Sequence, residues 1–99
     1  MTTNGLLELQ RWYSAQCDGS WEHQYGVKIQ TLDNPGWRVS IDLSDTPLAD
    51  RLFDETKFQG NKEHEWYSCR LNSKVFEGAC GPECLDKVLD IFLTWLKGS

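Results

Sequence analysis

The sequence predicts an α+β fold: an antiparallel sheet of four or five strands, with an N-terminal and a C-terminal helix packed on one face. Three observations predict it. Apolar residues recur at helical spacing near both ends of the chain, they alternate with polar residues in the middle, and turn sequences separate the alternating stretches. A length of 99 residues suits one domain spanning residues 1–99.

A first helix is expected from Asn4, a favourable N-cap residue, to about Cys17. One side of this helix is apolar, with Trp12 at its margin. Asp18-Gly19 then ends the helix, because Gly19 can adopt a left-handed conformation. The residues on the apolar side are Leu6, Leu9, Tyr13 and Cys17.

Alternation of apolar and polar residues follows and predicts a half-buried strand. In the turn at residues 33–36 (DNPG), proline presets one central position and Gly36 suits the positive φ of a type II turn. Alternation resumes at Trp37 and continues to Leu43, so residues 21–43 are expected to form a hairpin. The inward parity of its first strand comprises Trp21, His23, Tyr25, Val27, Ile29 and Thr31.

The second half of the sheet is predicted from weaker patterns. Residues 51–58 are compatible with a short edge strand, and a polar turn follows at residues 59–64. Residues 65–71 and 74–78, joined by Asn72-Ser73, are typical of a second hairpin. Neither pattern identifies the buried face.

The last helix opens at Gly81-Pro82, where the missing N–H of proline costs nothing. Its apolar stripe is wide, which predicts packing against both the sheet and the first helix. The stripe comprises Leu85, Val88, Leu89, Phe92, Leu93, Trp95 and Leu96.

The formal net charge of −5 and the scattered Lys and Arg residues argue against a nucleic-acid partner. An acidic surface instead attracts a basic protein, chiefly by speeding encounter. The excess concentrates in residues 40–55, where five carboxylates accompany the single Arg51; a solubilising loop is the alternative explanation. The five are Asp42, Asp45, Asp50, Asp54 and Glu55.

The N-terminal residues show neither the basic segment nor the apolar run of a signal peptide. No apolar run approaches the roughly 18 residues of a spanning helix, so no membrane partner is expected. These features predict a cytoplasmic location, in which the four cysteines would be reduced thiols.

The segment CDGSWEHQYG brings together a thiol, an imidazole and two carboxylates. Cys17 projects from the apolar side of its helix, and His23 shares its parity with Trp21, so both are expected to point into packing. Asp18 is expected to bond local backbone N–H groups. Glu22 faces away from His23, and no catalytic residue is predicted.

Cys80 and Cys84 form a second group of thiols. Three residues separate them, whereas redox motifs have two, and no further ligands stand at zinc-knuckle spacing. They are interpreted as a loop thiol and a first-turn helix thiol. No metal and no cofactor are predicted.

Residues 9–43, LQRWYSAQCDGSWEHQYGVKIQTLDNPGWRVSIDL, resemble the signature of the immunity protein 53 family, small bacterial cytosolic proteins associated with polymorphic toxin systems. The resemblance continues through EWYSC, FEGACGP and the final IFLTW, whereas residues 44–65 match no recognised pattern. Motif positions interpreted as structural are Cys17, Gly19, Trp21, His23, Tyr25, Asp33, Asn34, Pro35, Gly36 and Trp37.

The resemblance implies a protein that protects its producer by binding and blocking a cognate protein toxin. We expect occlusion of a basic toxin surface, as on a nuclease, with carboxylates steering association. Trp66 or Tyr67 is a candidate anchor, because one of the two must face away from the core. The candidate partner-binding residues are Asp18, Glu22, Asp42, Asp45, Asp50, Asp54, Glu55, Trp66 and Tyr67.

Two alternatives from other classes remain at this stage. One is a small thiol-dependent enzyme, such as a transferase using Cys17 or Cys80. The other is a general protein-binding adaptor without a toxin partner. Gene order separates the last from an immunity protein, whose gene is expected directly downstream of a toxin gene.

Overall fold

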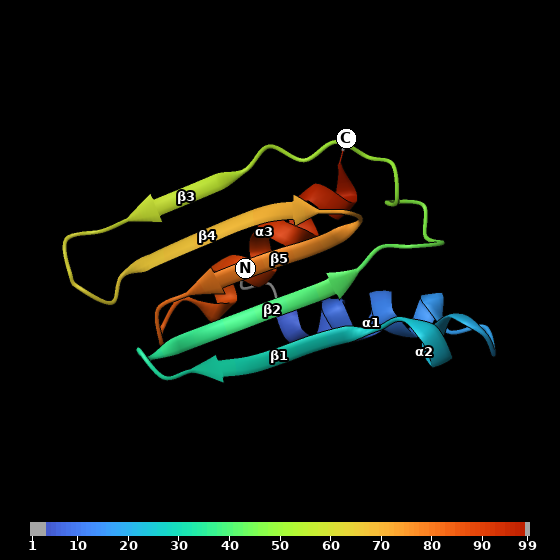
Figure 1. Cartoon of the computed structure of the whole chain (residues 1–99), viewed down its shortest axis with the longest axis horizontal. Coiled ribbons are helices and arrows are strands. Elements are labelled where there is room, and N and C mark those ends of the chain that lie inside the picture. The colour runs from blue at the N-terminus through green and yellow to red at the C-terminus, as the bar shows by residue number, and fades with distance from the viewer. Residues whose placement is uncertain (1–3, 99) are drawn as a thin grey trace.

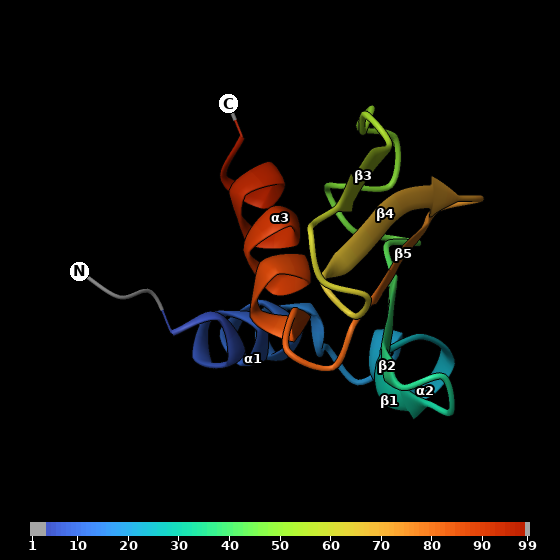
Figure 2. The same cartoon turned by 90° about the vertical axis from the view of Figure 1, so that its left-hand side faces the viewer.

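A computed structural model of the chain describes residues 4–98. It contains a five-stranded antiparallel sheet in the order β1-β2-β5-β4-β3, with the N-terminal and C-terminal helices on one face (Figures 1 and 2). The predicted fold class is therefore confirmed. The elements are α1 (Gly5–Gln16), α2 (Trp21–Gln24), β1 (Val27–Leu32), β2 (Gly36–Asp42), β3 (Thr56–Gln59), β4 (Trp66–Asn72), β5 (Val75–Cys80) and α3 (Leu85–Lys97).

The two long helices form where helical periodicity predicts them. Asn4 caps α1, since its side-chain oxygen accepts a 3.0 Å hydrogen bond from the Leu7 N–H. The buried part of the α3 stripe consists of Val88, Leu89, Phe92 and Leu93, which pack against β4, β5 and α1. The wide stripe thus covers two neighbours, as expected.

The buried side of α1 differs from the predicted one. Leu9 and Trp12 are its buried residues, whereas Leu6 and Tyr13 are exposed. The reason is that α1 packs mainly against α3, and Trp12 meets Phe92 edge to face with ring centroids 5.3 Å apart. Trp12 therefore lies at the centre of the interface and not at its margin.

The strand expected from residue 21 begins only at Val27, and residues 21–24 form the short helix α2. Gly19 lies between α1 and α2 with φ 92°, the left-handed conformation that was predicted for it. The Trp21 side chain is buried, and its indole nitrogen donates a 2.8 Å hydrogen bond to the Ser44 carbonyl. The prediction of a strand over residues 21–25 is therefore wrong, because the Asp18 and Glu22 carboxylates accept hydrogen bonds from the N–H groups of residues 18–21 and so favour a helical turn.

Both hairpins are present, but their turns differ from the predicted ones. The Asn34–Pro35 peptide is cis and Gly36 has no positive φ, so the turn is not type II. Gly36 is required for another reason: a Cβ there would collide with the Cys80 carbonyl oxygen of β5. In the second hairpin, positive φ values at residues 73 and 74 make those two the turn, in place of residues 72 and 73.

Helix α3 begins later than Pro82, the position predicted to open it. Cys84 is its N-cap residue and Leu85 its first residue, because the N–H of Cys84 bonds to the Gly81 carbonyl in a preceding turn. The Pro82 carbonyl accepts a 3.0 Å hydrogen bond from the Trp37 indole, which ties this turn to β2.

Candidate functional site

Cys17 and His23 both lie at the surface, so the prediction that they point into packing is wrong. Cys17 caps the C-terminus of α1, and its thiol donates a 3.4 Å hydrogen bond to the Tyr13 carbonyl. His23 follows the buried Trp21 by two helical residues, a rotation of about 200°, and therefore faces solvent. It borders an open hollow of about 700 Å³ to which Cys17 does not contribute. Within residues 4–98, no hydrogen bond joins this thiol to this imidazole.

The other three cysteines, Cys69, Cys80 and Cys84, are buried free thiols. Burial raises the pKa of the Cys69 thiol to about 12 and that of Cys80 to about 11. Both groups are therefore protonated at neutral pH and lack the thiolate that a nucleophile needs. Cys80 is the last residue of β5, so the prediction that it lies in a loop is wrong. In the described part of the chain, no three His, Cys, Asp or Glu side chains are grouped as metal ligands.

Asp18 and Glu22 are arranged to hold the α1–α2 connection. The Asp18 carboxylate accepts hydrogen bonds of 2.9 Å from the N–H groups of Ser20 and Trp21, as predicted for a turn residue. The Glu22 carboxylate reaches back to the N–H groups of Asp18 and Gly19 at 2.9 and 2.8 Å. Hydrogen bonds from Trp21 and then Ser20 lower the pKa of Asp18, and backbone hydrogen bonds, beginning with its own N–H, lower that of Glu22.

A second group of carboxylates lies on the connection between β2 and β3, which with the end of β2 we call the acidic segment (residues 42–55). Its first part is anchored by Leu43 and Leu48, which are fully buried, and by Thr46, whose hydroxyl donates to the Leu43 carbonyl at 2.7 Å. Asp42 is half-buried and accepts a hydrogen bond from the N–H of Ser44. The four exposed carboxylates are Asp45, Asp50, Asp54 and Glu55.

The second part of the acidic segment is held against the end of α3. Arg51 Nη1 donates hydrogen bonds of 2.8 and 3.1 Å to the carbonyls of Trp95 and Leu96, where a helix C-terminus attracts a cation. The Trp95 indole nitrogen donates a 2.8 Å hydrogen bond to the Leu52 carbonyl. Phe53 packs edge to face against Trp95, with ring centroids 5.3 Å apart. The acidic segment is therefore an ordered surface feature.

Leu52 is the residue of this segment that sequence reasoning missed. Its side chain is 91% exposed, whereas the neighbouring Phe53 packs against the core. A Leu-Phe pair in an extended segment places one side chain inward and the other outward, but the sequence does not say which.

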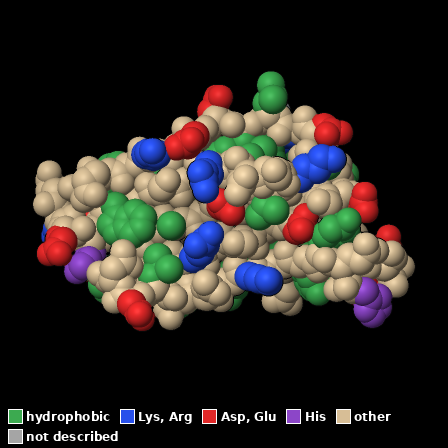
Figure 3. Space-filling model, viewed as in Figure 1, with side chains coloured by type: hydrophobic (Ala, Val, Ile, Leu, Met, Phe, Trp, Pro, Cys, Tyr) green, Lys and Arg blue, Asp and Glu red, His purple; other side chains and the backbone are tan. Residues whose placement is uncertain are grey.

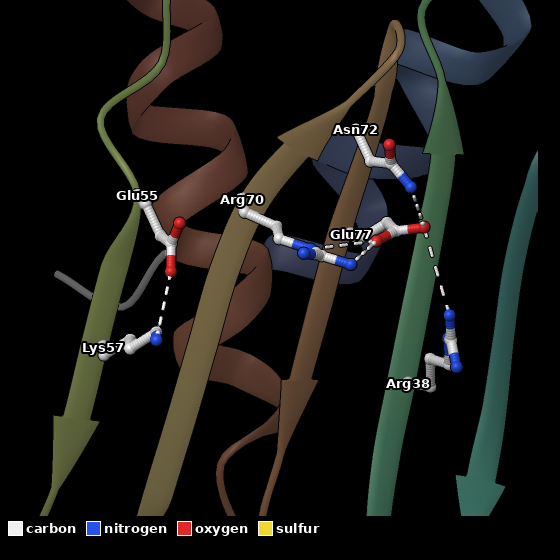
Figure 4. A network of polar contacts seen from close by, with 6 residues as sticks. All are labelled: Arg38, Glu55, Lys57, Arg70, Asn72 and Glu77. Carbon is white, nitrogen blue, oxygen red and sulfur yellow. Dashed lines mark hydrogen bonds and ion pairs between the residues drawn. The ribbon is translucent and has the colours of Figure 1, made fainter.

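The sheet face opposite the helices has a different charge character (Figure 3). Four basic residues point outward there from four strands, and Figure 3 shows basic side chains spread across the middle of this face. Glu77, whose side chain is only 19% exposed, lies at the centre: it pairs with Arg70 at 3.1 Å and approaches Arg38 at 4.0 Å (Figure 4). Lys57 pairs with Glu55 at 3.2 Å. The four basic residues are Lys28, Arg38, Lys57 and Arg70.

The predicted pair of aromatic candidates lies on β4. Tyr67 packs against the core and stacks on the exposed Phe58 with centroids 5.1 Å apart. Trp66, its half-buried neighbour, has the opposite parity and faces away from the core, as one of the two had to. Tyr67 and Phe58 line an open hollow of about 650 Å³ beside the first turn of α3.

Residues 4–98 therefore present two surfaces of opposite charge. None of the helices in the described part of the chain has the length and apolarity needed to cross a bilayer. Comparison with known families matches the model of immunity protein 53 to residues 6–97. No curated protein matches the chain, and no solved structure matches it.

Proposed function

This chain belongs to the immunity protein 53 family, and from that membership we propose that it neutralises a cognate toxin of a polymorphic toxin system by binding it and covering its active surface. The family match covers residues 6–97, almost the whole chain, and this supports the immunity role. The toxin is proposed to be a basic protein, such as a nuclease, that acts in the cytoplasm where this chain is made.

The acidic segment is the surface that we propose for the toxin. Asp45, Asp50 and Asp54 are exposed and form no ion pair within residues 4–98. Unpaired carboxylates on an ordered segment create a local negative potential, which speeds encounter with a basic partner. Arg51, the one cation of the segment, donates its hydrogen bonds to the carbonyls at the end of α3 and forms no ion pair with these carboxylates within residues 4–98.

Asp18, Glu22, Trp66 and Tyr67 are kept as secondary candidates. Trp21 links the α2 region to the acidic segment through its hydrogen bond to Ser44, so Asp18 and Glu22 lie at the same end of the sheet as Asp42. Their lone pairs already accept backbone hydrogen bonds, which leaves less capacity for a partner.

Inhibition by binding, and not catalysis, is the mechanism that these observations support. Cys80 is buried with a raised pKa, and Cys17 has no imidazole bonded to it among residues 4–98. The decisive experiment co-expresses this chain with the protein encoded by the reading frame directly upstream of its gene and follows growth. Protection by the parent chain, and equally by a Cys17→Ser variant, supports inhibition without a thiol. A complex that fails to form between the two purified proteins would refute the proposed function.

A further inference from the structure

Leu52 is the most exposed of the large apolar side chains in residues 4–98, at 91%, followed by Leu6 at 61%. A single exposed leucine is ordinary on a protein surface, so exposure alone indicates no function. The backbone and charges around Leu52 distinguish it from Leu6.

The backbone around Leu52 is held on both sides. Its own carbonyl accepts the 2.8 Å hydrogen bond from the Trp95 indole, and the preceding Arg51 is bonded to the end of α3. The following Phe53 contacts both Phe76 and Trp95, with ring centroids 5.5 and 5.3 Å away. The segment is therefore ordered before any partner arrives, which removes an entropic cost of binding.

Carboxylates flank Leu52 along the chain. Asp50 and Asp54 stand two residues before and after Leu52, and neither forms an ion pair in the described part of the chain. Glu55 follows, with Lys57 bonded to it.

An exposed apolar side chain on an ordered segment, flanked by charged residues, has the features of an interface anchor. Binding energy concentrates in side chains that are fully desolvated at the centre of an interface, and the polar rim excludes water and selects the partner. We propose that Leu52 is the anchor by which this chain binds its toxin. Its side chain enters an apolar socket on the toxin, and Lys or Arg residues on the rim of that socket meet Asp50 and Asp54.

This inference rests on the proposed function, and charge selects the toxin over other occupants. In a symmetric dimer centred on Leu52, Asp50 and Asp54 of both copies would face each other, and like charges would oppose association. An anionic bilayer would be repelled in the same way. A basic protein surface with an apolar socket satisfies both the leucine and its carboxylates.

The test measures association and dissociation rates between this chain and the protein encoded directly upstream, for the parent, Leu52→Ala and Leu6→Ala. Leu6→Ala is the matched control, because it removes the same atoms from another exposed position. Both variants should unfold at the parent temperature, since neither side chain is buried. Leu52→Ala is expected to dissociate at least about tenfold faster with little change in association rate, and Leu6→Ala is expected to match the parent.

The outcomes separate the anchor from the proposed function. If the parent binds and Leu52→Ala dissociates within about twofold of it, the anchor is refuted while the immunity role stands. A parent chain that does not bind the upstream protein overturns both. A parent that sediments as a dimer, which Leu52→Ala converts to a monomer, assigns Leu52 to self-association and overturns the anchor.

Discussion

Arg51 and Trp95 hold the acidic segment to the last turn of α3: Arg51 Nη1 donates a 2.8 Å hydrogen bond to the Trp95 carbonyl, and the guanidinium carbon lies 5.9 Å from the centroid of the Trp95 ring. The Trp95 indole returns a hydrogen bond to the carbonyl of the residue after Arg51. These contacts hold the connection between β2 and β3 against α3.

Arg51→Ala should lower the free energy of unfolding by about 1 kcal/mol. The substitution removes two hydrogen bonds to helix-terminal carbonyls and the favourable placement of a cation there. Urea denaturation measures the change. Arg11→Ala, at an exposed position of α1 without an ion pair in residues 4–98, is the control and should leave stability within about 0.5 kcal/mol of the parent.

The same Arg51→Ala variant should also weaken toxin binding, and the sign of this effect is diagnostic. Charge alone predicts tighter binding, because the variant is more acidic on the proposed interface. Loss of order around Leu52 predicts faster dissociation, and we expect this effect to be the larger. Tighter binding by the variant, measured from its dissociation rate, would contradict a role for pre-organisation.

Conversion of Asp45, Asp50 and Asp54 to Asn should slow association with the toxin severalfold at low salt and reduce its dependence on ionic strength. Steering by exposed charges acts mainly on the association rate and is screened by salt. The control converts the exposed Asp33, Glu83 and Asp86, which lie outside the acidic segment, to their amides. Equal association rates for the two triple variants would show that steering does not depend on this segment.

Gly36→Ala should destabilise the fold by about 2–3 kcal/mol, because the added methyl group collides with a backbone carbonyl of the adjacent strand. Gly26→Ala supplies a matched control, since a Cβ at that position has no neighbour within 4 Å. Thermal unfolding should place the Gly26 variant at or slightly above the parent. Parent-like stability of both variants would contradict the close packing of β2 on β5.

Alkaline pH should destabilise the protein through Cys69 and Cys80. Burial in the folded state raises the pKa of the two thiols to about 12 and about 11, from an ordinary thiol value of 9.0. The unfolded chain therefore loses these protons first, so the contribution is complete below about pH 9 and is lost as pH rises towards 11–12. Urea denaturation from pH 7 to 11 should show this fall, and a Cys69→Ala, Cys80→Ala double variant should show a smaller slope.

The long helices and the two hairpins could be predicted because their signals are local. Asn4 provides its cap within one turn, and the stripe on α3 repeats within thirteen residues. The alternation around His23 wrongly predicted a strand, because other local interactions oppose it. Hydrogen bonds that the Asp18 and Glu22 carboxylates accept from neighbouring backbone N–H groups outweigh a pattern that fits a strand equally well over four residues.

The candidate site was only partly predictable. Its carboxylates are visible in the sequence as an excess of acidic residues between residues 40 and 55, and four of them are exposed in the structure. The basic face opposite the helices was not predicted, because Lys28, Arg38, Lys57 and Arg70 are far apart along the chain. Strand pairing brings them onto one surface.

The sequence by itself determined the fold class, the family and the sign of the charge on the β2–β3 connection, since periodicity, motif spacing and composition are properties of the chain. Only the tertiary structure decided that Leu52 faces solvent while Phe53 packs inward. Phe53 packs on Phe76 of β5 and Trp95 of α3, and the Trp95 indole bonds the Leu52 carbonyl from 43 residues later; contacts between segments so distant in the chain exist only once the chain has folded.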